Sequence, residues 1–363
     1  MKSFNNSILV LAIALALLPD TSLLVKAQSQ PAPLTSKELV ALVYQLPAHP
    51  ERRDEIVAEV RKRGIGFPLS SGMRSLVASK SGNDALLRRT LEEAERRRLN
   101  PAASVLPPEK EANELLERTR AATLAAADAM PDFLVKQLIK RSVAYGTTSN
   151  WLTQDNLTIA VGYRANSGEQ YKVLAINGMP SSPDAEQTDD YSKNVGGGAS
   201  SRGVEYISAL ANLFKPESKT EFKLADTDLV RDRRTLVYEF EVRKPFSSLT
   251  LSSGSATTGA GSRGRLWIDR ETNRVLRFEQ IATEIEPGFP ITAAQTLINY
   301  DWVTIGEKKY LLPTNSEVVL TSVINQRALQ SRNEIRFRNY QKFSAELKII
   351  DEIEDDDFPP EKP

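Results

Sequence analysis

Residues 234–243 read RTLVYEFEVR and have the alternation of a β-strand. Leu236, Tyr238 and Phe240 recur at every second position, and charged residues such as Glu239 fall between them. Successive side chains of a strand point to opposite faces, so this stretch has one apolar face and one polar face. The pattern predicts an antiparallel strand that is buried on one side.

Strand-like stretches continue on both sides of this segment. They are residues 133–144, 157–163, 170–176, 220–225, 264–268, 274–284, 295–304, 309–323 and 333–343. Turn-forming residues separate several of them, as in DRETN at 269–273 and GEK at 306–308. About ten strands in sequence order, joined by turns, predict a meandering antiparallel sheet rather than a parallel one.

The chain before this sheet has a helical period. Between residues 35 and 99, apolar residues recur at spacings of three and four, and Pro, Gly and Ser-Gly-Asn breaks divide them into four short amphipathic helices. We therefore predict a helical module over 34–100 and a Pro-rich linker over 101–108. A longer helix is expected at 109–129, and the apolar stripe of 203–214 predicts another helix that crosses the sheet.

These patterns together predict an α+β fold. A small all-α module precedes a curved antiparallel β-sheet, a half-barrel crossed by helices, which extends over residues 109–350. Two segments rich in small and polar residues, 181–201 and 252–264, are expected to be mobile. Residues 351–363 begin with DEIEDDD and are expected to form a solvated acidic tail.

The N-terminus resembles an export signal. Lys2 precedes the apolar run ILVLAIALALL at 8–18, and small residues lead to Ala27. We predict a signal peptide over 1–27, because eleven apolar residues are too few to span a bilayer core of about 30 Å. The mature chain would then be periplasmic or extracellular, and no later stretch is long and apolar enough to form a transmembrane segment.

Composition excludes several classes of function. The chain has 363 residues, 47 basic and 47 acidic side chains, one histidine (His49) and no cysteine. The charge balance argues against a nucleic-acid partner, and the missing cysteines and histidines remove thiol chemistry, thiolate zinc sites and multi-histidine metal sites. We expect no metal and no cofactor.

The candidate catalytic motifs are weak. The sequence GAGSRG at 259–264 matches the dinucleotide fingerprint G-x-G-x-x-G, but a strand rather than a helix is expected after it. Two carboxylate pairs could support acid–base chemistry: Glu239 with Glu241, and Asp226 with Asp228. A solvated sheet face accounts for the first pair, and turn formation for the second. The basic clusters at 61–63 and 96–98 are expected to complement helix dipoles.

The strands also carry a set of aromatic residues that could line an apolar cavity. These candidates are Tyr238, Phe240, Trp267, Phe278, Tyr300, Trp302 and Phe337. An ordinary core would use the same residues, but residues 311–324 have apolar side chains on both faces, and only a couple of helices are available to cover them. One sheet face could therefore accept a guest.

Three segments carry a likeness to a known fold: GRLWIDRETNRVLRFE at 264–279, YDWVTIGEKKYLLPTNSEVVL at 300–320 and MPDFLVKQLIKRSV at 130–143. They resemble the half-barrel of the periplasmic lipoprotein-carrier family and its relatives, the lipoprotein receptor and the sigma-factor regulatory sensor. The resemblance covers most of residues 109–350. It implies that the concave face of the sheet binds acyl chains or the apolar segment of a partner.

Three functional hypotheses follow. The first is an exported, non-enzymatic binding protein of the bacterial envelope whose partner is a lipid or an acylated protein. The second is an envelope scaffold that docks a protein partner through the helical module. The third is a carboxylate-dependent hydrolase, for which Glu239 would be essential.

Overall fold

The computed structural model describes residues 31–146, 150–165, 167–182, 187–195, 206–324 and 326–343. The predicted signal peptide and the predicted acidic tail lie outside the described residues, as does much of the segment 181–201 that was expected to be mobile. In the part that is described, none of the helices combines the length and apolar composition needed to span a bilayer.

The four predicted helices of the front module are present. They are α1 (Ser36–Val43), α2 (Arg53–Arg63), α3 (Ser71–Lys80) and α4 (Ala85–Leu99), with the 3₁₀ turns η1 (Pro50–Arg52) and η2 (Pro101–Ser104). Thr35 and Glu38 form a capping box at the start of α1, and these hydrogen bonds from Thr35 hold the pKa of Glu38 at about 2. The apolar faces of the four helices form a core of their own, which includes Leu39, Val60 and Leu87.

Two further helices belong to the sheet region. The helix expected over 109–129 is α5 (Glu109–Asp128). The crossing helix is α6 (Ile207–Phe214), which is shorter than expected and is followed by the 3₁₀ turn η4 (Pro216–Ser218). The remaining short turns are η3 (Tyr191–Asn194) and η5 (Lys244–Phe246).

All ten predicted strands are present, and three were not predicted. The strands are β1 (Phe133–Tyr145), β2 (Leu152–Arg164), β3 (Gly168–Ile176), β4 (Met179–Pro180), β5 (Glu221–Val230), β6 (Arg233–Val242), β7 (Thr250–Ser253), β8 (Ala256–Gly259), β9 (Gly261–Asp269), β10 (Val275–Thr283), β11 (Ile291–Ile305), β12 (Lys308–Ile324) and β13 (Arg327–Lys342). The structure therefore confirms the α+β class.

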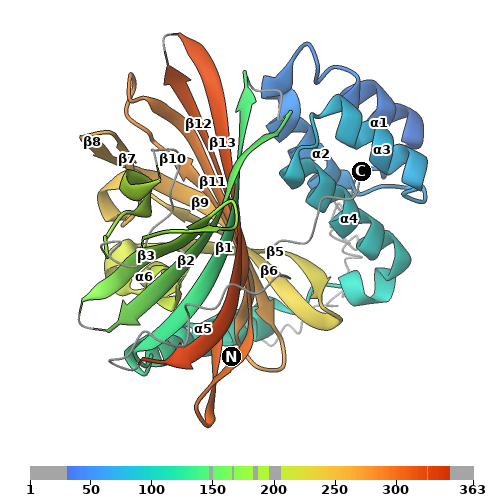
Figure 1. Cartoon of the computed structure of the whole chain (residues 1–363). Coiled ribbons are helices and arrows are strands. Elements are labelled where there is room, and N and C mark those ends of the chain that lie inside the picture. Colours follow the sequence, from blue (N-terminus) through green and yellow to red (C-terminus); the bar gives the residue numbers. More distant parts are fainter. Residues whose placement is uncertain are drawn as a thin grey trace, which may run out of the picture. The chain divides into compact units, whose positions relative to one another are not determined.

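Eleven strands form one open antiparallel sheet, which Figure 1 shows to be strongly twisted. Its order is β4-β3-β2-β1-β13-β12-β11-β10-β9-β6-β5. The sheet consists of two meanders rather than one, because the first long strand, β1, pairs with the last strand, β13. Sequence order alone does not reveal this long-range pairing.

Two local predictions were wrong. The segment 252–264 was expected to be mobile, but it forms the β7–β8 hairpin and the start of β9, because backbone hydrogen bonds between strands order even small side chains. Asp226 and Asp228 were expected to flank a turn, yet both lie within strand β5. A strand interior tolerates them because their carboxylates have arginine partners, Arg97 and Arg96.

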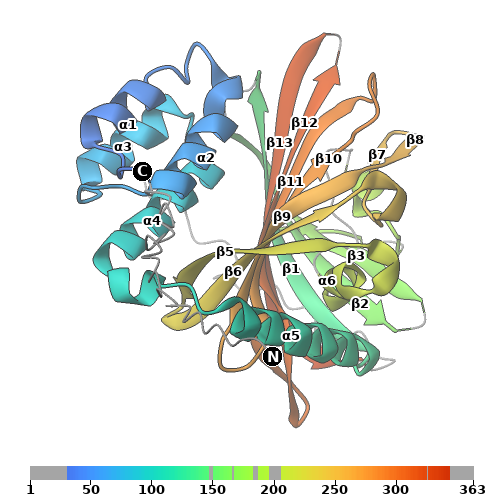
Figure 2. The ribbon, with the colours of Figure 1, turned by 180° about the vertical axis from the view of Figure 1, so that it is seen from behind.

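The main core lies between one face of the sheet and the helices α5 and α6, which Figure 2 brings to the front. Strand alternation places Leu266, Phe278 and Ile298 side by side on this face, because they are register partners on β9, β10 and β11. Leu115 of α5 and Leu210 of α6 pack against the same cluster. We call this the helix-covered face of the sheet.

Gly264 shows how closely the strands pack near this core. It pairs with Phe240 on β6 and Gln280 on β10. A Cβ at this position would lie 1.8 Å from the carbonyl oxygen of Glu279 and 2.8 Å from Cε1 of Phe240. The last glycine of the G-x-G-x-x-G sequence is therefore required by crowding inside a sheet.

Replacement of this glycine should destabilise the fold. We expect Gly264→Ala to lower the free energy of unfolding by about 2 kcal/mol or more, because the methyl group must displace backbone. Gly259→Ala is the matched control from the same motif, since its Cβ would meet nothing within 4 Å, and it should stay within about 0.5 kcal/mol of wild type. Urea unfolding followed by circular dichroism measures both, and equal midpoints for the two variants would contradict the crowding.

Candidate functional site

The seven aromatic residues proposed as cavity lining are buried with one exception. Trp302 is 37% exposed. The buried ones are Tyr238, Phe240, Trp267, Phe278, Tyr300 and Phe337. They do not form a single surface. Five belong to a cluster that includes residues of both faces of the sheet, and Phe337 belongs to a second cluster around Phe133 and Tyr206.

Three of these residues lie together on the helix-covered face. The rings of Phe240 and Phe278 stack with centroids 5.7 Å apart. The Tyr238 hydroxyl donates a 2.7 Å hydrogen bond to the carbonyl oxygen of Ala112 in α5, and burial raises the pKa of Tyr238 to about 12. This contact holds the first half of α5 against β6.

Trp267 lies on the opposite face. Its indole nitrogen donates a 3.0 Å hydrogen bond to the carboxylate of Asp228, and the guanidinium carbons of Arg265 and Arg277 are each 5.5 Å from its ring centroid. Trp267 pairs with Arg277, and Phe278 is the next residue of β10. Because successive residues of a strand point to opposite faces, Trp267 and Phe278 lie on opposite faces of the sheet.

A cavity of about 310 Å³ lies beside α6 on the helix-covered face. Its apolar lining comes from Leu213 of α6, Val242, Leu249 and Phe278. Ala209 of α6 also lines it, and the polar part of the lining includes serine side chains, Lys215 and Glu217. The volume is at the lower end of the roughly 300–1,000 Å³ of small-molecule sites, so this cavity suits a short apolar guest with a polar end.

A second, larger cleft of about 800 Å³ lies between α2 and strands β5, β6, β9 and β10. Glu239 and Glu241, the carboxylates weighed for acid–base chemistry, are exposed and line it. Arg61 and Glu279 line the same cleft, so charged side chains of both signs surround it. Such a lining favours ion pairing over the recognition of an uncharged guest.

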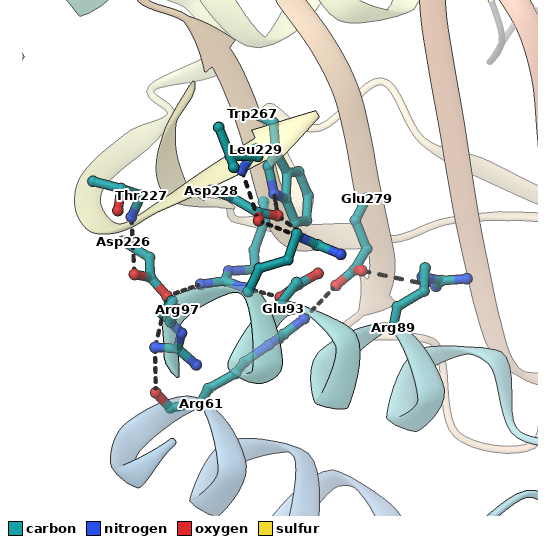
Figure 3. A network of polar contacts seen from close by, with 12 residues as sticks. Arg61, Arg89, Glu93, Arg97, Asp226, Thr227, Asp228, Leu229, Trp267 and Glu279 are labelled. Atoms are coloured by element: carbon teal, nitrogen blue, oxygen red, sulfur yellow. Dashed lines mark hydrogen bonds and ion pairs between the residues drawn. The ribbon is translucent and has the colours of Figure 1, made fainter. Parts of the chain in front are cut away.

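Below this cleft, arginines and carboxylates form a polar network between the helical module and the sheet (Figure 3). Arg61 of α2 donates to Glu279 of β10 at 3.0 Å, and Arg89 of α4 lies 3.8 Å from the other oxygen of the same carboxylate. Arg265 of β9 donates to Glu93 of α4 at 3.1 Å, and both side chains are almost completely buried. These pairs link the module to the centre of strands β9 and β10.

The network continues to strand β5. Arg96 makes a two-pronged contact with Asp228, at 2.8 and 3.0 Å. Arg97 lies 2.8 Å from Asp226 and also donates to the carbonyl oxygen of Arg61. The C-terminal turn of α4 is therefore fixed to β5 by two arginines.

Burial raises the pKa values of these carboxyl groups, and the nearby arginines lower them. Burial raises the pKa of Glu93 and of Asp226 above the usual range, although Arg265 and Arg97 partly compensate. Burial also opposes ionisation of Glu279, but the nearby Arg61 and Arg89 outweigh it and hold the pKa of Glu279 below the usual range. Since each carboxylate is committed to an arginine, the network holds structure together rather than offering a free acid or base.

Sequence reasoning did not find this network. The clusters at 61–63 and 96–98 were assigned to helix dipoles, whereas Arg61, Arg96 and Arg97 have carboxylate partners on the sheet. One signal was available: Arg89, Glu93 and Arg96 recur at helical spacing on a single face of α4, and buried charges need partners. Among the described residues, no group of three or more His, Cys, Asp or Glu side chains could hold a metal ion.

Comparison with known proteins gives matches to solved structures alone. No protein-family model matches this chain, and no curated protein matches it. A DUF1329 family protein from Desulfovibrio piger is 13% identical, with 68% of this chain and 98% of that chain covered, at a TM-score of 0.31. A LolA superfamily protein from Nitrosomonas europaea is 12% identical, with coverage of 64% and 96% and a TM-score of 0.27.

A putative outer membrane lipoprotein-sorting protein domain from Vibrio parahaemolyticus is 9% identical to this chain. The match covers 62% of this chain and 91% of that domain, at a TM-score of 0.25. At these identities and TM-scores, the fold assignment rests on the strand order and helix packing of the chain itself.

The polar network predicts a pH-dependent contribution of Glu279 to stability. Because its pKa is lowered in the folded chain, its ionised form stabilises the fold fully above the ordinary value of 4.5, and this contribution is lost as the pH falls toward the lowered value. Glu279→Gln should therefore lower the free energy of unfolding by about 3 kcal/mol at pH 7, and by progressively less as the pH falls.

Urea unfolding at pH 7 and at pH 3.5 measures this difference. Glu239→Gln is the control, since this exposed carboxylate lies on β6, which β9 separates from β10, and its loss should change stability by less than about 0.5 kcal/mol. If the difference in free energy of unfolding between wild type and Glu279→Gln were larger at pH 3.5 than at pH 7, the prediction would be contradicted.

Proposed function

We propose that this chain is an exported, non-enzymatic binding protein that takes a short acyl chain, or the apolar segment of a partner, in the cavity beside α6. The observation that carries the proposal is the 310 Å³ cavity itself, whose floor is formed by Val242, Leu249 and Phe278. Export is inferred from the signal-like sequence of residues 1–27.

The chemistry of the cavity fits an amphiphilic guest. Burial of apolar surface on the floor would contribute about 25 cal/mol per Å². At the rim, Lys215 donates a 2.9 Å hydrogen bond to the amide oxygen of Asn212, which leaves its ammonium group with capacity for an anionic head. The hydroxyls of Ser247 and of the buried Ser262 add polar groups to the lining.

The walls of the cavity allow it to adapt to a guest. The helix α6 is one wall, and it has only eight residues with a strongly apolar inner face. A helix of this length has little stability of its own in water, and its position therefore depends on packing against the sheet. A guest that replaces part of this packing would shift α6 at modest cost.

Native mass spectrometry of protein purified without detergent, followed by uptake of a fluorescent fatty acid, tests the proposal. We expect one bound guest per chain, and Ala209→Phe should reduce uptake at least tenfold because position 209 lines the cavity. Trp302→Ala is the control, since this residue does not line it, and uptake should be unchanged. Wild-type protein that carries no guest and takes up no fatty acid would refute the proposal.

The scaffold hypothesis is supported by a different observation. Leu99, Val105 and Leu106, at the end of α4 and in the linker, are 60%, 69% and 45% exposed. Exposed apolar side chains this close in sequence are a feature of protein-binding surfaces. Under this hypothesis, Leu99→Ser with Val105→Ser would release a bound partner and leave fatty-acid uptake unchanged.

A further inference from the structure

A third hollow lies on the face of the sheet opposite α6, between α3, α4 and strand β10. Its volume is about 520 Å³. Its charged lining consists of Arg74, Arg88, Arg89, Glu92, Arg96 and Arg277. Five of these residues are arginines and one is a carboxylate, so the lining is strongly cationic. We call it the arginine cleft.

Three of the arginines have carboxylate partners. Arg74 pairs with Glu92 at 2.7 Å, Arg96 pairs with Asp228 at 2.8 Å, and Arg89 lies 3.3 Å from Glu317. These pairs fix the positions of the guanidinium groups and neutralise them. Arg88 and Arg277 take no part in these ion pairs.

Arg277 is the unusual member of the cleft. It is largely withdrawn from solvent on β10, yet within the described part of the chain no carboxylate lies within 4.0 Å of it. Its Nε donates to the amide oxygen of Asn299 at 2.8 Å, and its guanidinium carbon lies 5.5 Å from the Trp267 ring centroid. Burial lowers the pKa of Arg277, and the more distant carboxylates of Glu93 and Asp228 do not offset it. For Arg61 and Arg96 burial acts in the same direction, but their carboxylate partners outweigh it and raise the pKa.

Arg88 supplies a second cation at the solvent side. It is exposed on α4, and it has no carboxylate within salt-bridge distance among the residues that the structure describes. The cleft therefore holds two guanidinium groups that form no ion pair with a described residue, one half-buried and one exposed. Planar guanidinium groups bind phosphate oxygens in pairs, and two positive charges match a phosphate monoester of about −1.5 to −2 charge.

The other walls of the cleft are apolar. Leu69, Val77 and Leu91 are buried residues that also belong to the core of the helical module, and Ala78 is half-buried beside them. A ligand that reached Arg277 would therefore place its neighbouring atoms against aliphatic side chains. Inorganic phosphate would use the cationic half of the cleft alone.

We propose that the arginine cleft binds a phosphate monoester with a short apolar substituent, with the phosphate on Arg277 and Arg88 and the substituent against Val77 and Leu91. This site lies on the other face of the sheet from the cavity beside α6 and does not depend on the proposed function. The phosphate could belong to a lipid-like amphiphile or be free in solution, and the experiment separates these sources.

Isothermal titration calorimetry of the full chain with hexyl phosphate tests the site. We expect saturable binding of one molecule per chain, at least tenfold tighter than inorganic phosphate and than hexanoate. Hexanol should give no saturable binding. Equal affinity for inorganic phosphate would overturn the amphiphile assignment, equal affinity for hexanoate would overturn the phosphate assignment, and no saturation with hexyl phosphate would overturn the site itself.

Variants locate the binding. Arg277→Gln should weaken hexyl phosphate at least tenfold, and Arg274→Gln is the matched control, because Arg274 precedes the same strand but donates to the carbonyl oxygen of Ala122 in α5. Arg88→Gln should weaken binding about threefold. Because Arg88 lies on an exposed helix surface, this variant should fold even if Arg277→Gln does not. Binding that survives both cleft substitutions, or that falls equally with Arg274→Gln, would overturn the proposal.

Discussion

The burial of charge on strands β9 and β10 is the constraint on which the rest of the molecule depends. Arg265 and Glu279 lie on one sheet face, almost completely withdrawn from water. A charge in such a position is tolerated when a partner of opposite sign is supplied with good geometry. The helical module supplies Glu93 and Arg61 as those partners. Arg265 and Glu279 are also register partners across β9 and β10. Removal of the module would take away Glu93 and Arg61, so each strand would lose its best-placed ion pair and module and sheet are coupled energetically.

The same strand positions explain why the two faces have such different chemistry. Along β10, Arg277 and Glu279 face the polar network, and Phe278 between them faces α6. A shift of one residue in register would bury both charges in the aromatic core and place Phe278 among the arginines. The network therefore also fixes the register of β10. The cavity beside α6 and the arginine cleft are opposite sides of a single stretch of strand.

Sequence reasoning recovered the elements because local periodicity encodes them. Alternation in residues 234–243 and the spacings of three and four between residues 35 and 99 gave the right elements, and these signals depend on neighbours within a few residues. The pairing of β1 with β13 involves positions nearly two hundred residues apart, which no local pattern contains. The arginine–carboxylate network was missed for the same reason. The aromatic residues were found, but only strand register shows that Trp267 and Phe278 face opposite ways.

The pairing of β1 with β13 also has a consequence for how the chain reaches its native state. Until β13 is available, β1 and β12 each present an unpaired edge, and exposed edges promote association with other chains. Contacts between such distant segments form slowly, because a long loop must close first. A chain built this way can join its two meanders into one sheet only after β13 has been made.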